Sequence, residues 1–292
     1  MRVVMFEPKG QRARLGVLRA PDVIDLAAAA DESGRPAGYF ASAAQFLEAG
    51  EEALSRAHSL LSAASPSAVY TPATVRLCAP VPRPGKVVAI GLNYRDHSIE
   101  QGVQPPSAPL FFAKFPTSVT GPYDPIVIPP GDPQVDYEAE LAVVIGRRCK
   151  AIREAEAMDY VGGYMVLNDV SARSWQFADK QWVRGKSCDT FCPIGPWLTT
   201  RDDVPDPHNL DIATRVNGIT LQNSNTSKLI FRIPQLIAYI SVSITLEPGD
   251  IIATGTPEGV GVFRKPPIFL KDGDVVEVEI EGLGALRNPV RE

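Results

Sequence analysis

The hydrophobic residues of this chain fall mostly into short runs of the β type. After about residue 75, segments rich in Val, Ile and Leu are separated by Pro, Gly and Asp, and these segments predict strands at Val87–Ile90, Leu110–Lys114, Ile126–Ile128, Asp136–Ile145, Gly163–Asn168, Leu210–Val216, Ile251–Thr254 and Asp274–Ile280. Helical spacing in this part is convincing only near Ala155–Tyr160 and Ile233–Ser241. Many strands with few helices predict a mixed α/β, β-rich fold and not a doubly wound sheet.

The first part of the chain has a different pattern. Arg2–Phe6 and Ala13–Leu18 predict a short hairpin around E-P-K-G-Q, and Ser42–Leu61 shows apolar residues at helical spacing. Ser42 has the side chain of a helix N-cap. Gly50 lies on the apolar face and is expected to divide this run into two shorter helices.

A linker is predicted where Ser, Ala and Pro accumulate, at Ser62–Pro72. We therefore expect a small α+β N-terminal domain over residues 1–75 and a larger catalytic domain over residues 76–292.

The segment V-D-Y-E-A-E-L-A-V-V-I-G, from Val135 to Gly146, has a row of acids on one face of its predicted strand. Because strand side chains alternate, Asp136, Glu138 and Glu140 share a face that turns apolar further along. Neighbours on one face are about 6.5–7 Å apart at their Cα atoms, so two Glu side chains can reach one cation. Mg²⁺, Mn²⁺ and Ca²⁺ take such oxygen ligands. The alternative is that these acids face solvent on a half-exposed sheet.

A further acid, Asp169, follows the apolar strand Tyr164–Leu167 in Y-M-V-L-N-D-V-S-A-R. An Asp at this position is often only a helix N-cap. Combined with Glu138 and Glu140, it makes a three-carboxylate set that suits Mg²⁺ and leaves positions open for water and substrate. Ligation by histidine is not expected, since the chain has only 3 His residues.

Four polar residues are candidates for catalysis or substrate binding. His97 and Glu100 are three residues apart, so one helical turn places them side by side, and a Glu beside an imidazole makes it a better base. Lys186 follows a Gly between aromatic residues and could hold a substrate oxygen. Thr256, in A-T-G-T-P-E-G-V-G, lies in a tight loop that can offer donors to an anion. Each has a plain alternative as a surface or turn residue.

Composition excludes several classes of function. The chain has 292 residues, 45% of them hydrophobic, and a formal charge of −5, so nucleic acid and anionic membranes are poor candidate partners. Its 4 cysteines form no C-x-x-C pair, and the start of the chain has no signal peptide, which predicts reduced thiols in a cytoplasmic protein. The fingerprints of P-loop, Rossmann and serine-hydrolase proteins do not occur.

Six sequence blocks, in this order and spacing, resemble the fumarylacetoacetate hydrolase family across roughly residues 80 to 290. They are G-L-N-Y-R-D-H at Gly91, F-F-A-K-F at Phe111, D-Y-E-A-E-L at Asp136, N-D-V-S-A-R at Asn168, G-K-S-C-D-T-F at Gly185 and T-G-T-P-E-G-V-G at Thr254. The tail G-V-F-R-K-P-P-I-F-L-K-D-G-D is most similar to the domain-containing protein 2 branch of the family.

The resemblance implies the family's C-terminal catalytic fold, a mixed β-sheet roll, usually in a homodimer that binds Mg²⁺ or Mn²⁺, with Ca²⁺ as a substitute in crystals. It also implies that Glu138, Glu140 and Asp169 are the metal ligands. His97 and Glu100 are then a water-activating dyad on a lid. The implied substrate contacts are Lys186, Thr256, Gln176 and Asn93. Asp136 is then a neighbour of the ligands. Several family members have Arg where this chain has Leu92, and Arg95 is the expected partial replacement.

The resemblance further implies an enzyme for 2-oxo or 1,3-dioxo acids, with a small oxo acid as its only expected partner besides a second subunit. The leading hypothesis is hydrolysis of a C–C bond in an acylpyruvate through a metal-stabilised enolate. An oxaloacetate tautomerase or an oxaloacetate decarboxylase would use the same residues. A non-catalytic metal-binding scaffold is an alternative of another class, and the complete set of polar residues speaks against it.

Overall fold

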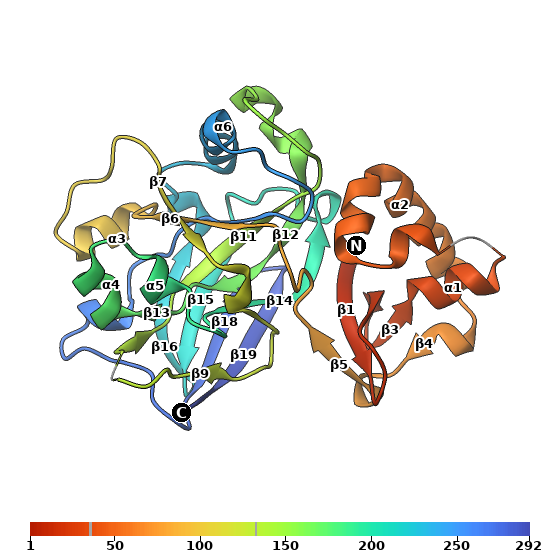
Figure 1. Cartoon of the computed structure of the whole chain (residues 1–292), viewed down its shortest axis with the longest axis horizontal. Helices are drawn as coiled ribbons and strands as arrows, with labels where there is room; N and C mark the ends of the chain where they lie inside the picture. Colours follow the sequence, from red (N-terminus) through yellow and green to blue (C-terminus); the bar gives the residue numbers. More distant parts are fainter. Residues whose placement is uncertain (35–36, 132) are drawn as a thin grey trace.

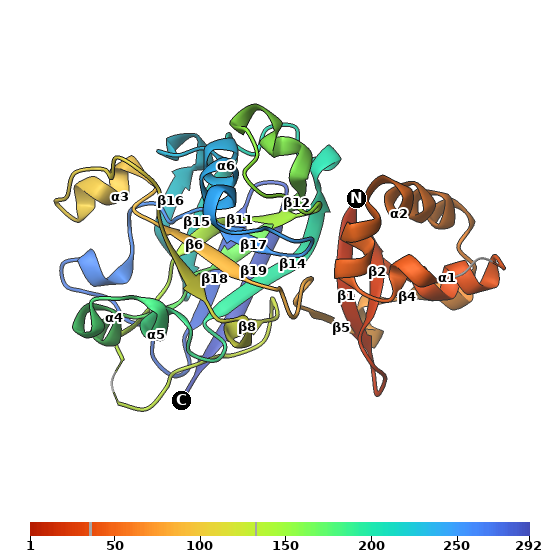
Figure 2. The ribbon, with the colours of Figure 1, turned by 45° about the horizontal axis from the view of Figure 1, so that its top comes forward.

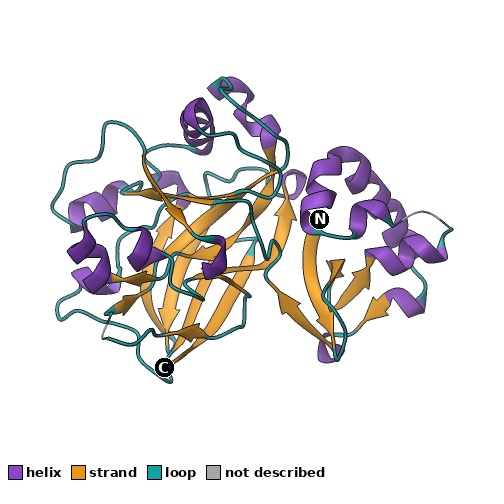
Figure 3. Ribbon diagram, in the orientation of Figure 1, coloured by secondary structure: helices purple, strands orange, loops and turns teal. Residues whose placement is uncertain are grey.

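The computed structural model describes residues 1–34, 37–131 and 133–292, and its strands gather in the middle of the molecule with the helices around them (Figures 1 and 3). One large mixed sheet contains, in spatial order, β4 (Val69–Tyr70), β3 (Asp22–Asp25), β2 (Arg14–Arg19), β1 (Arg2–Pro8), β14 (Cys192–Thr200), β12 (Val161–Asn168), β11 (Ala139–Ile145), β17 (Ile251–Ala253), β6 (Val87–Gly91) and β7 (Leu110–Lys114). Two strands lie beside this path: β5 (Val75–Cys78) pairs with β1, and β8 (Val119–Thr120) pairs with β14.

A second, five-stranded sheet has the order β16 (Ile219–Asn225), β15 (Asp211–Val216), β18 (Val275–Ile280), β19 (Gly284–Arg291) and β9 (Ile126–Val127). The short strands β10 (Val135–Asp136) and β13 (Ser171–Ala172) pair separately. The described α-helices are α1 (Leu26–Glu32), α2 (Ala43–Ala63), α3 (Arg95–Glu100), α4 (Arg173–Asp179), α5 (Val183–Lys186) and α6 (Ile233–Ser243). The expected mixed, β-rich fold class is confirmed.

The large sheet is buried on both faces, because a different hydrophobic cluster covers each. Along β11, Leu141 and Val143 pack into the cluster that also contains residues of β15, β18, β19 and α6. Ala142 and Val144 point the other way, into a cluster that contains Phe46 of α2 and the first residues of the chain. The alternation predicted for this strand is therefore real, but both of its faces are internal.

The N-terminal predictions are confirmed in detail. β1 and β2 form the predicted antiparallel hairpin. Ser42 caps α2 by accepting a hydrogen bond of 3.2 Å from the backbone nitrogen of Gln45. Gly50 breaks the helix as predicted, with a φ of 56° and a ψ of −129°, although it is exposed and not part of the buried face; glycine adopts this positive φ without strain.

The N-terminal strands and helices form a lobe beside the larger body (Figure 1). Hydrogen bonds nevertheless continue from this lobe into the body, since β1 pairs with β14 as well as with β2 and β5. The division at residue 75 stays a prediction.

Several elements differ from the sequence expectation. The acidic strand is interrupted at Tyr137 and Glu138, between β10 and β11. The segment near Ala155–Tyr160 forms a 3-10 helix, Glu154–Tyr160. β14, β16 and β19 were not predicted, and α4 and α5 also escaped the pattern because helices of 7 and 4 residues are too short to show an apolar period.

Among the described residues, no helix combines the length and the apolar character that crossing a membrane requires.

We predict that Gly163→Ala destabilises the fold. Gly163 pairs with Thr200 where β12 meets β14, and a Cβ there would overlap the carbonyl oxygen of Thr199 and approach Leu198 to 2.9 Å. Because backbone atoms cannot move aside cheaply, we expect the free energy of unfolding to fall by about 1–3 kcal/mol. Urea denaturation measures it.

Gly38→Ala is the matched control, because a Cβ at Gly38 meets nothing within 4 Å. If the two variants have equal free energies of unfolding, β12 and β14 accommodate the added Cβ without loss of stability, and the prediction is wrong.

Candidate active site

Three acids meet where β11 and β12 lie side by side. The two strands pair antiparallel with Ala139 opposite Asn168, so Glu138, just before β11, and Glu140, within it, reach Asp169 just after β12. Carboxylate oxygens of these three residues lie within 4.8 Å of one another. Their side chains are not solvent-facing, since the three residues are 6%, 1% and 1% exposed. The structure thus excludes the half-exposed alternative for this row of acids.

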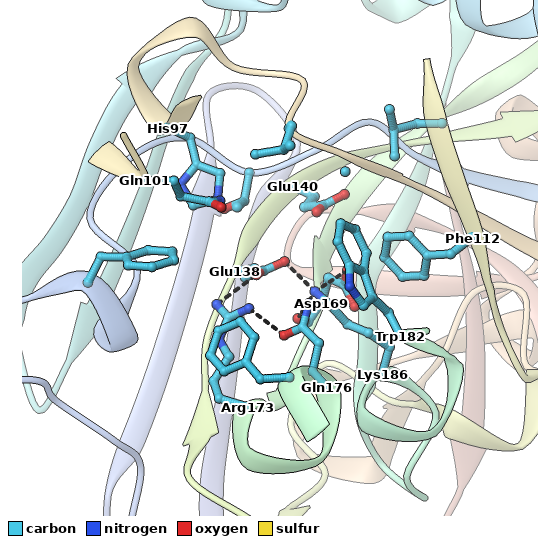
Figure 4. A pocket seen from close by; sticks show the side chains of 16 residues that line it. His97, Gln101, Phe112, Glu138, Glu140, Asp169, Arg173, Gln176, Trp182 and Lys186 are labelled. Atoms are coloured by element: carbon cyan, nitrogen blue, oxygen red, sulfur yellow. Dashed lines mark hydrogen bonds and ion pairs between the residues drawn. The ribbon is translucent and has the colours of Figure 1, made fainter. Parts of the chain in front are cut away.

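Three buried cations surround the acids. Lys186 lies between two of them, with its Nζ 2.6 Å from Glu138 Oε2 and 2.8 Å from Asp169 Oδ2 (Figure 4). Arg173 holds the other oxygen of Glu138 at 2.7 Å. Lys114, on β7, forms an ion pair of 2.6 Å with Asp169 Oδ1. Each of these lysines and arginines is nearly fully buried, so the whole cluster is shielded from solvent.

Asp136 belongs to the same network through Arg173, whose guanidinium forms a 2.8 Å ion pair with it. Its carboxylate also accepts hydrogen bonds from the backbone nitrogens of Gly261 and Val262, at 2.7 and 3.0 Å. Asp136 therefore fixes Arg173 and the following loop, in agreement with its expected place beside the ligands.

The charges of this cluster do not balance. It contains four carboxylates and three cations, and within the described residues no Lys, Arg or His forms an ion pair with Glu140. Among the residues that the structure describes, Glu140 accepts one hydrogen bond, of 2.8 Å from the backbone nitrogen of Gly255. Burial and the nearby charges of Asp169 and Glu138 raise the pKa of Glu140 well above its usual range. With Glu140 ionised, the cluster therefore lacks one positive charge, and a proton or a cation has to supply it.

Glu138 is in the opposite situation. Burial alone would raise the pKa of this carboxyl group, but the charges of Lys186 and Arg173 outweigh burial and lower the pKa to about 2. Burial would likewise lower the pKa of Lys186, and Asp169 and Glu138 raise it instead. Glu138 is thus ionised and Lys186 protonated around neutral pH.

The donor set fits a hard divalent cation. Glu138, Glu140 and Asp169 offer carboxylate oxygens, which Mg²⁺ and Mn²⁺ prefer, and a cation among them would neutralise the uncompensated Glu140. Their convergence agrees with the ligand set that the sequence implied.

The His97–Glu100 pair forms as predicted, on the short helix α3. His97 Nδ1 lies 2.8 Å from Glu100 Oε2, and the other oxygen of Glu100 accepts a hydrogen bond of 2.9 Å from the backbone nitrogen of Gly259. The imidazole also lies 6.0 Å from the ring of Phe263, measured between centroids. Figure 2 shows α3 above α4, on the side of the larger body that faces away from the N-terminal lobe. The loop after Thr256 therefore holds the dyad in place.

One pocket brings His97, the three acids and Lys186 together (Figure 4). Its polar wall is formed by His97, Gln101, Glu138, Glu140, Asp169, Arg173, Gln176, Lys186 and Thr256. Its apolar wall includes Leu92, Phe112, Phe177, Trp182 and Phe263. Charge is thus concentrated at the acids, and aromatic rings surround the remainder.

The expected substrate-binding residues take different places. Gln176 and Thr256 line the pocket. Asn93 is fully buried, and its amide bonds to the backbone of Thr254 and Phe231, so it supports the loop structure. Arg95 lies exposed at the start of α3, outside the pocket lining, and in this conformation it does not replace the charge missing at Leu92.

Sequence reasoning assigned no role to four polar residues of this region: Lys114, Arg173, Gln101 and Gln222. Lys114 and Arg173 lie inside the family-like blocks F-F-A-K-F and N-D-V-S-A-R. Their place in these blocks could have indicated that they belong to the site. Gln222 lies on β16, distant in sequence from every motif, and donates a hydrogen bond of 2.9 Å to the hydroxyl of Thr256. No sequence pattern pointed to it.

Comparison with known proteins places this site in a family. Residues 86–291 match the family model described as fumarylacetoacetate (FAA) hydrolase, C-terminal. The mitochondrial oxaloacetate tautomerase Fahd2a of Rattus norvegicus is 53% identical over 247 residues, which cover 84% of this chain and 78% of that protein.

Solved structures share the fold over the whole chain. A putative HpcE protein from Mycobacterium smegmatis is 35% identical with a TM-score of 0.86, covering 100% of this chain and 99% of its own. Maleylpyruvate hydrolase from Sphingobium sp. SYK-6, in complex with manganese(II) ion and pyruvate, is 34% identical with a TM-score of 0.82 and the same coverage. The fold expected from the family resemblance is confirmed.

We predict that Glu140→Gln stabilises the metal-free protein and abolishes its response to Mg²⁺. The amide keeps an acceptor for Gly255 but removes the buried charge that has no cation, which we expect to raise the free energy of unfolding by about 1–3 kcal/mol. Mg²⁺ should raise the melting temperature of the wild-type protein, because binding to the native state stabilises it. Thermal melts with chelator or Mg²⁺ measure both effects.

Glu51→Gln, at an exposed position, is the control. A wild-type protein whose melting temperature ignores Mg²⁺ and Mn²⁺ would contradict the metal assignment.

Proposed function

The chain belongs to the fumarylacetoacetate hydrolase family, and from that premise we propose that it is a divalent-metal-dependent enzyme that interconverts the keto and enol forms of oxaloacetate. The observation that carries this proposal is one pocket that contains His97, which Glu100 holds through Nδ1, together with three convergent carboxylates and a buried lysine. Such a site contains a base, a cation-binding set and a donor for an oxyanion, which are the parts that enolisation needs. The 53% identity to the rat oxaloacetate tautomerase supports the choice of substrate.

Glu138, Glu140 and Asp169 would hold the cation, either Mg²⁺ or Mn²⁺. A divalent cation there supplies a Lewis acid that polarises the 2-oxo group and increases the acidity of the adjacent C–H bonds. The manganese(II) in the Sphingobium maleylpyruvate hydrolase complex supports this assignment.

The protein's own groups then move one proton. In the neutral dyad the Glu100 carboxylate accepts from Nδ1–H of His97, which leaves Nε2 as the base. Nε2 takes the C3 proton of keto-oxaloacetate, and Glu100 stabilises the imidazolium that forms. Lys186 Nζ donates to the oxygen on which negative charge develops. Delivery of the proton from Nε2 to that oxygen gives the enol, and the reverse sequence gives the keto form.

Thr256 is placed to bind the substrate carboxylate. Its hydroxyl oxygen accepts a hydrogen bond of 2.9 Å from Gln222 Nε2, and its O–H can therefore donate into the pocket. Gln222 is itself fixed, because its carbonyl oxygen accepts from Thr214 at 2.7 Å and from the backbone nitrogen of Ala139 at 2.9 Å. These hydrogen bonds orient the Thr256 hydroxyl so that it can donate to a substrate carboxylate.

Hydrolysis of an acylpyruvate is the second candidate, because the structurally similar Sphingobium enzyme is a maleylpyruvate hydrolase. Here His97 would take a proton from water, the hydroxide would add to the distal carbonyl carbon, and the C–C bond would break toward pyruvate. Decarboxylation of oxaloacetate needs no base, so it would not depend on His97. These three outcomes differ in what they require of the dyad.

The proposal includes a homodimer and a cytoplasmic location. Exposed apolar side chains on β7 and α6, at Leu110, Tyr239 and Val242, support an interface with a second subunit. The four cysteines are all free thiols, which suits a reducing compartment.

We predict that His97→Ala lowers the rate constant for oxaloacetate tautomerisation by about 10²–10⁴-fold, because a general base is lost. The assay follows the ultraviolet absorbance of the enol with Mg²⁺ present, and chelator should remove the activity of the wild-type protein. His58→Ala, an exposed histidine on α2, is the control. Full activity in the His97 variant would refute the assignment of the base.

Thr256→Val should act mainly on substrate binding. It keeps the shape of the side chain and removes the O–H donor, so we expect KM to rise about 10- to 100-fold with a smaller change in kcat. Steady-state kinetics on oxaloacetate measure the two constants separately. An unchanged KM would show that the carboxylate binds elsewhere.

A further inference from the structure

Gln101 contacts the catalytic nitrogen of the dyad. It is the residue directly after α3, and its amide Nε2 lies 2.7 Å from His97 Nε2. The two side chains lie next to each other at one side of the pocket, across from Glu138 and Glu140 (Figure 4). Neither the metal assignment nor the proton transfer described above uses Gln101.

The hydrogen bonds of Glu100 determine the direction of this contact. An ionised carboxylate only accepts, so Glu100 Oε2, at 2.8 Å, requires the proton of the neutral imidazole to be on Nδ1. His97 Nε2 then has a lone pair and no proton. The Gln101 amide is therefore the donor, and it occupies the lone pair that has to accept a proton during catalysis.

The contact is built into the end of the helix. The backbone nitrogen of Gln101 donates to the carbonyl oxygen of His97 at 3.1 Å, and residues four apart on a helix lie on the same face. On another side, the ring of Phe263 packs against the imidazole. Gln101 is only partly buried, so its side chain can turn away when a substrate enters.

The two candidate reactions make different demands on His97 Nε2. Hydrolysis needs a water molecule hydrogen-bonded to this lone pair, in the place that the Gln101 amide occupies. Tautomerisation needs no water: a C–H bond gives its proton to Nε2, and an oxygen of the same substrate receives it. A half-turn of the amide replaces its NH₂ group by its carbonyl oxygen, which can accept from protonated Nε2–H. The Gln101 amide can therefore hydrogen-bond to His97 Nε2 both when this nitrogen is unprotonated and when it is protonated.

We propose that Gln101 is a positioning residue that keeps nucleophilic water away from His97 Nε2 and so directs this site toward tautomerisation and away from C–C hydrolysis. This inference rests on the proposed function, because it assumes that His97 is the base. The substrate displaces the amide when its C3 hydrogen approaches Nε2, and the amide then returns.

Gln101→Met tests the inference, because methionine keeps the length of the side chain and removes both donor and acceptor. The purified full-length protein with Mg²⁺ is assayed for tautomerisation of oxaloacetate and for pyruvate release from acetylpyruvate. We expect the ratio of hydrolysis to tautomerisation to rise about tenfold, the effect of one lost hydrogen bond. Gln104→Met is the matched control, since Gln104 is exposed in the same segment and does not line the pocket.

A ratio within about twofold of the wild-type value would overturn the inference, and so would an equal fall of both activities, which a purely structural role produces. A wild-type protein and Gln104 variant that catalyse neither reaction would instead refute the proposed function, and the inference would fall with it.

A second measurement reads the contact without turnover. Imidazole ¹⁵N spectra of the metal-free protein should show His97 protonated at Nδ1, with an Nε2 resonance that shifts in Gln101→Met and stays unchanged in Gln104→Met. The small number of histidines, 3 in the chain, makes the assignment simple. The inference would be overturned if His97 is protonated at Nε2, or if the chemical shift of Nε2 is the same in Gln101→Met as in the wild-type protein.

Discussion

The structure depends on burying a group of carboxylates where two central strands of its largest sheet, β11 and β12, begin and end. Removing one carboxylate from water costs several kcal/mol unless a cation or several donors replace the water. Lys186, Arg173 and Lys114 do this for three of the four acids, whereas in the described part of the chain Glu140 has only a backbone donor, that of Gly255. A cluster that is short of one positive charge has a strong electrostatic preference for a cation, and this preference defines the site.

The cations that compensate the buried carboxylates come from separate segments of the chain. Lys114 comes from β7, Arg173 from α4 and Lys186 from α5, while the acids belong to the segment around β10 and β11 and to the end of β12. Asp136 joins Arg173 to the loop at Gly261, and Glu100 joins the dyad to the same loop at Gly259. The loop therefore connects the charged cluster with α3, the helix of the proposed base, so a displacement of one would move the other.

The chemistry of the cluster leaves several outcomes open, and the side chains at its edge select among them. A cation site, Lys186 and a base are shared by every reaction that passes through an enolate. What differs is the access of water to His97 and the donors that meet the distal part of the substrate. In the mechanism that we propose, Gln101 beside His97 and Thr256 beside Gln222 are the residues that act on these two points.

The sequence by itself determined the elements whose signal is local. The two-residue alternation around Glu138 and Glu140, the cap at Ser42, the break at Gly50 and the three-residue spacing of His97 and Glu100 all follow from a few neighbouring residues. Ordered sequence blocks also identified the acids, Lys186 and Thr256 as members of one site. Only the tertiary structure decided that the acidic face is buried, that Arg173 and Lys114 pair with it, and that Gln101 and Gln222 complete it. The reason is physical: burial and ion pairing are properties of segments that meet in space, and strands such as β16 carry no local sign of the partner against which they will pack.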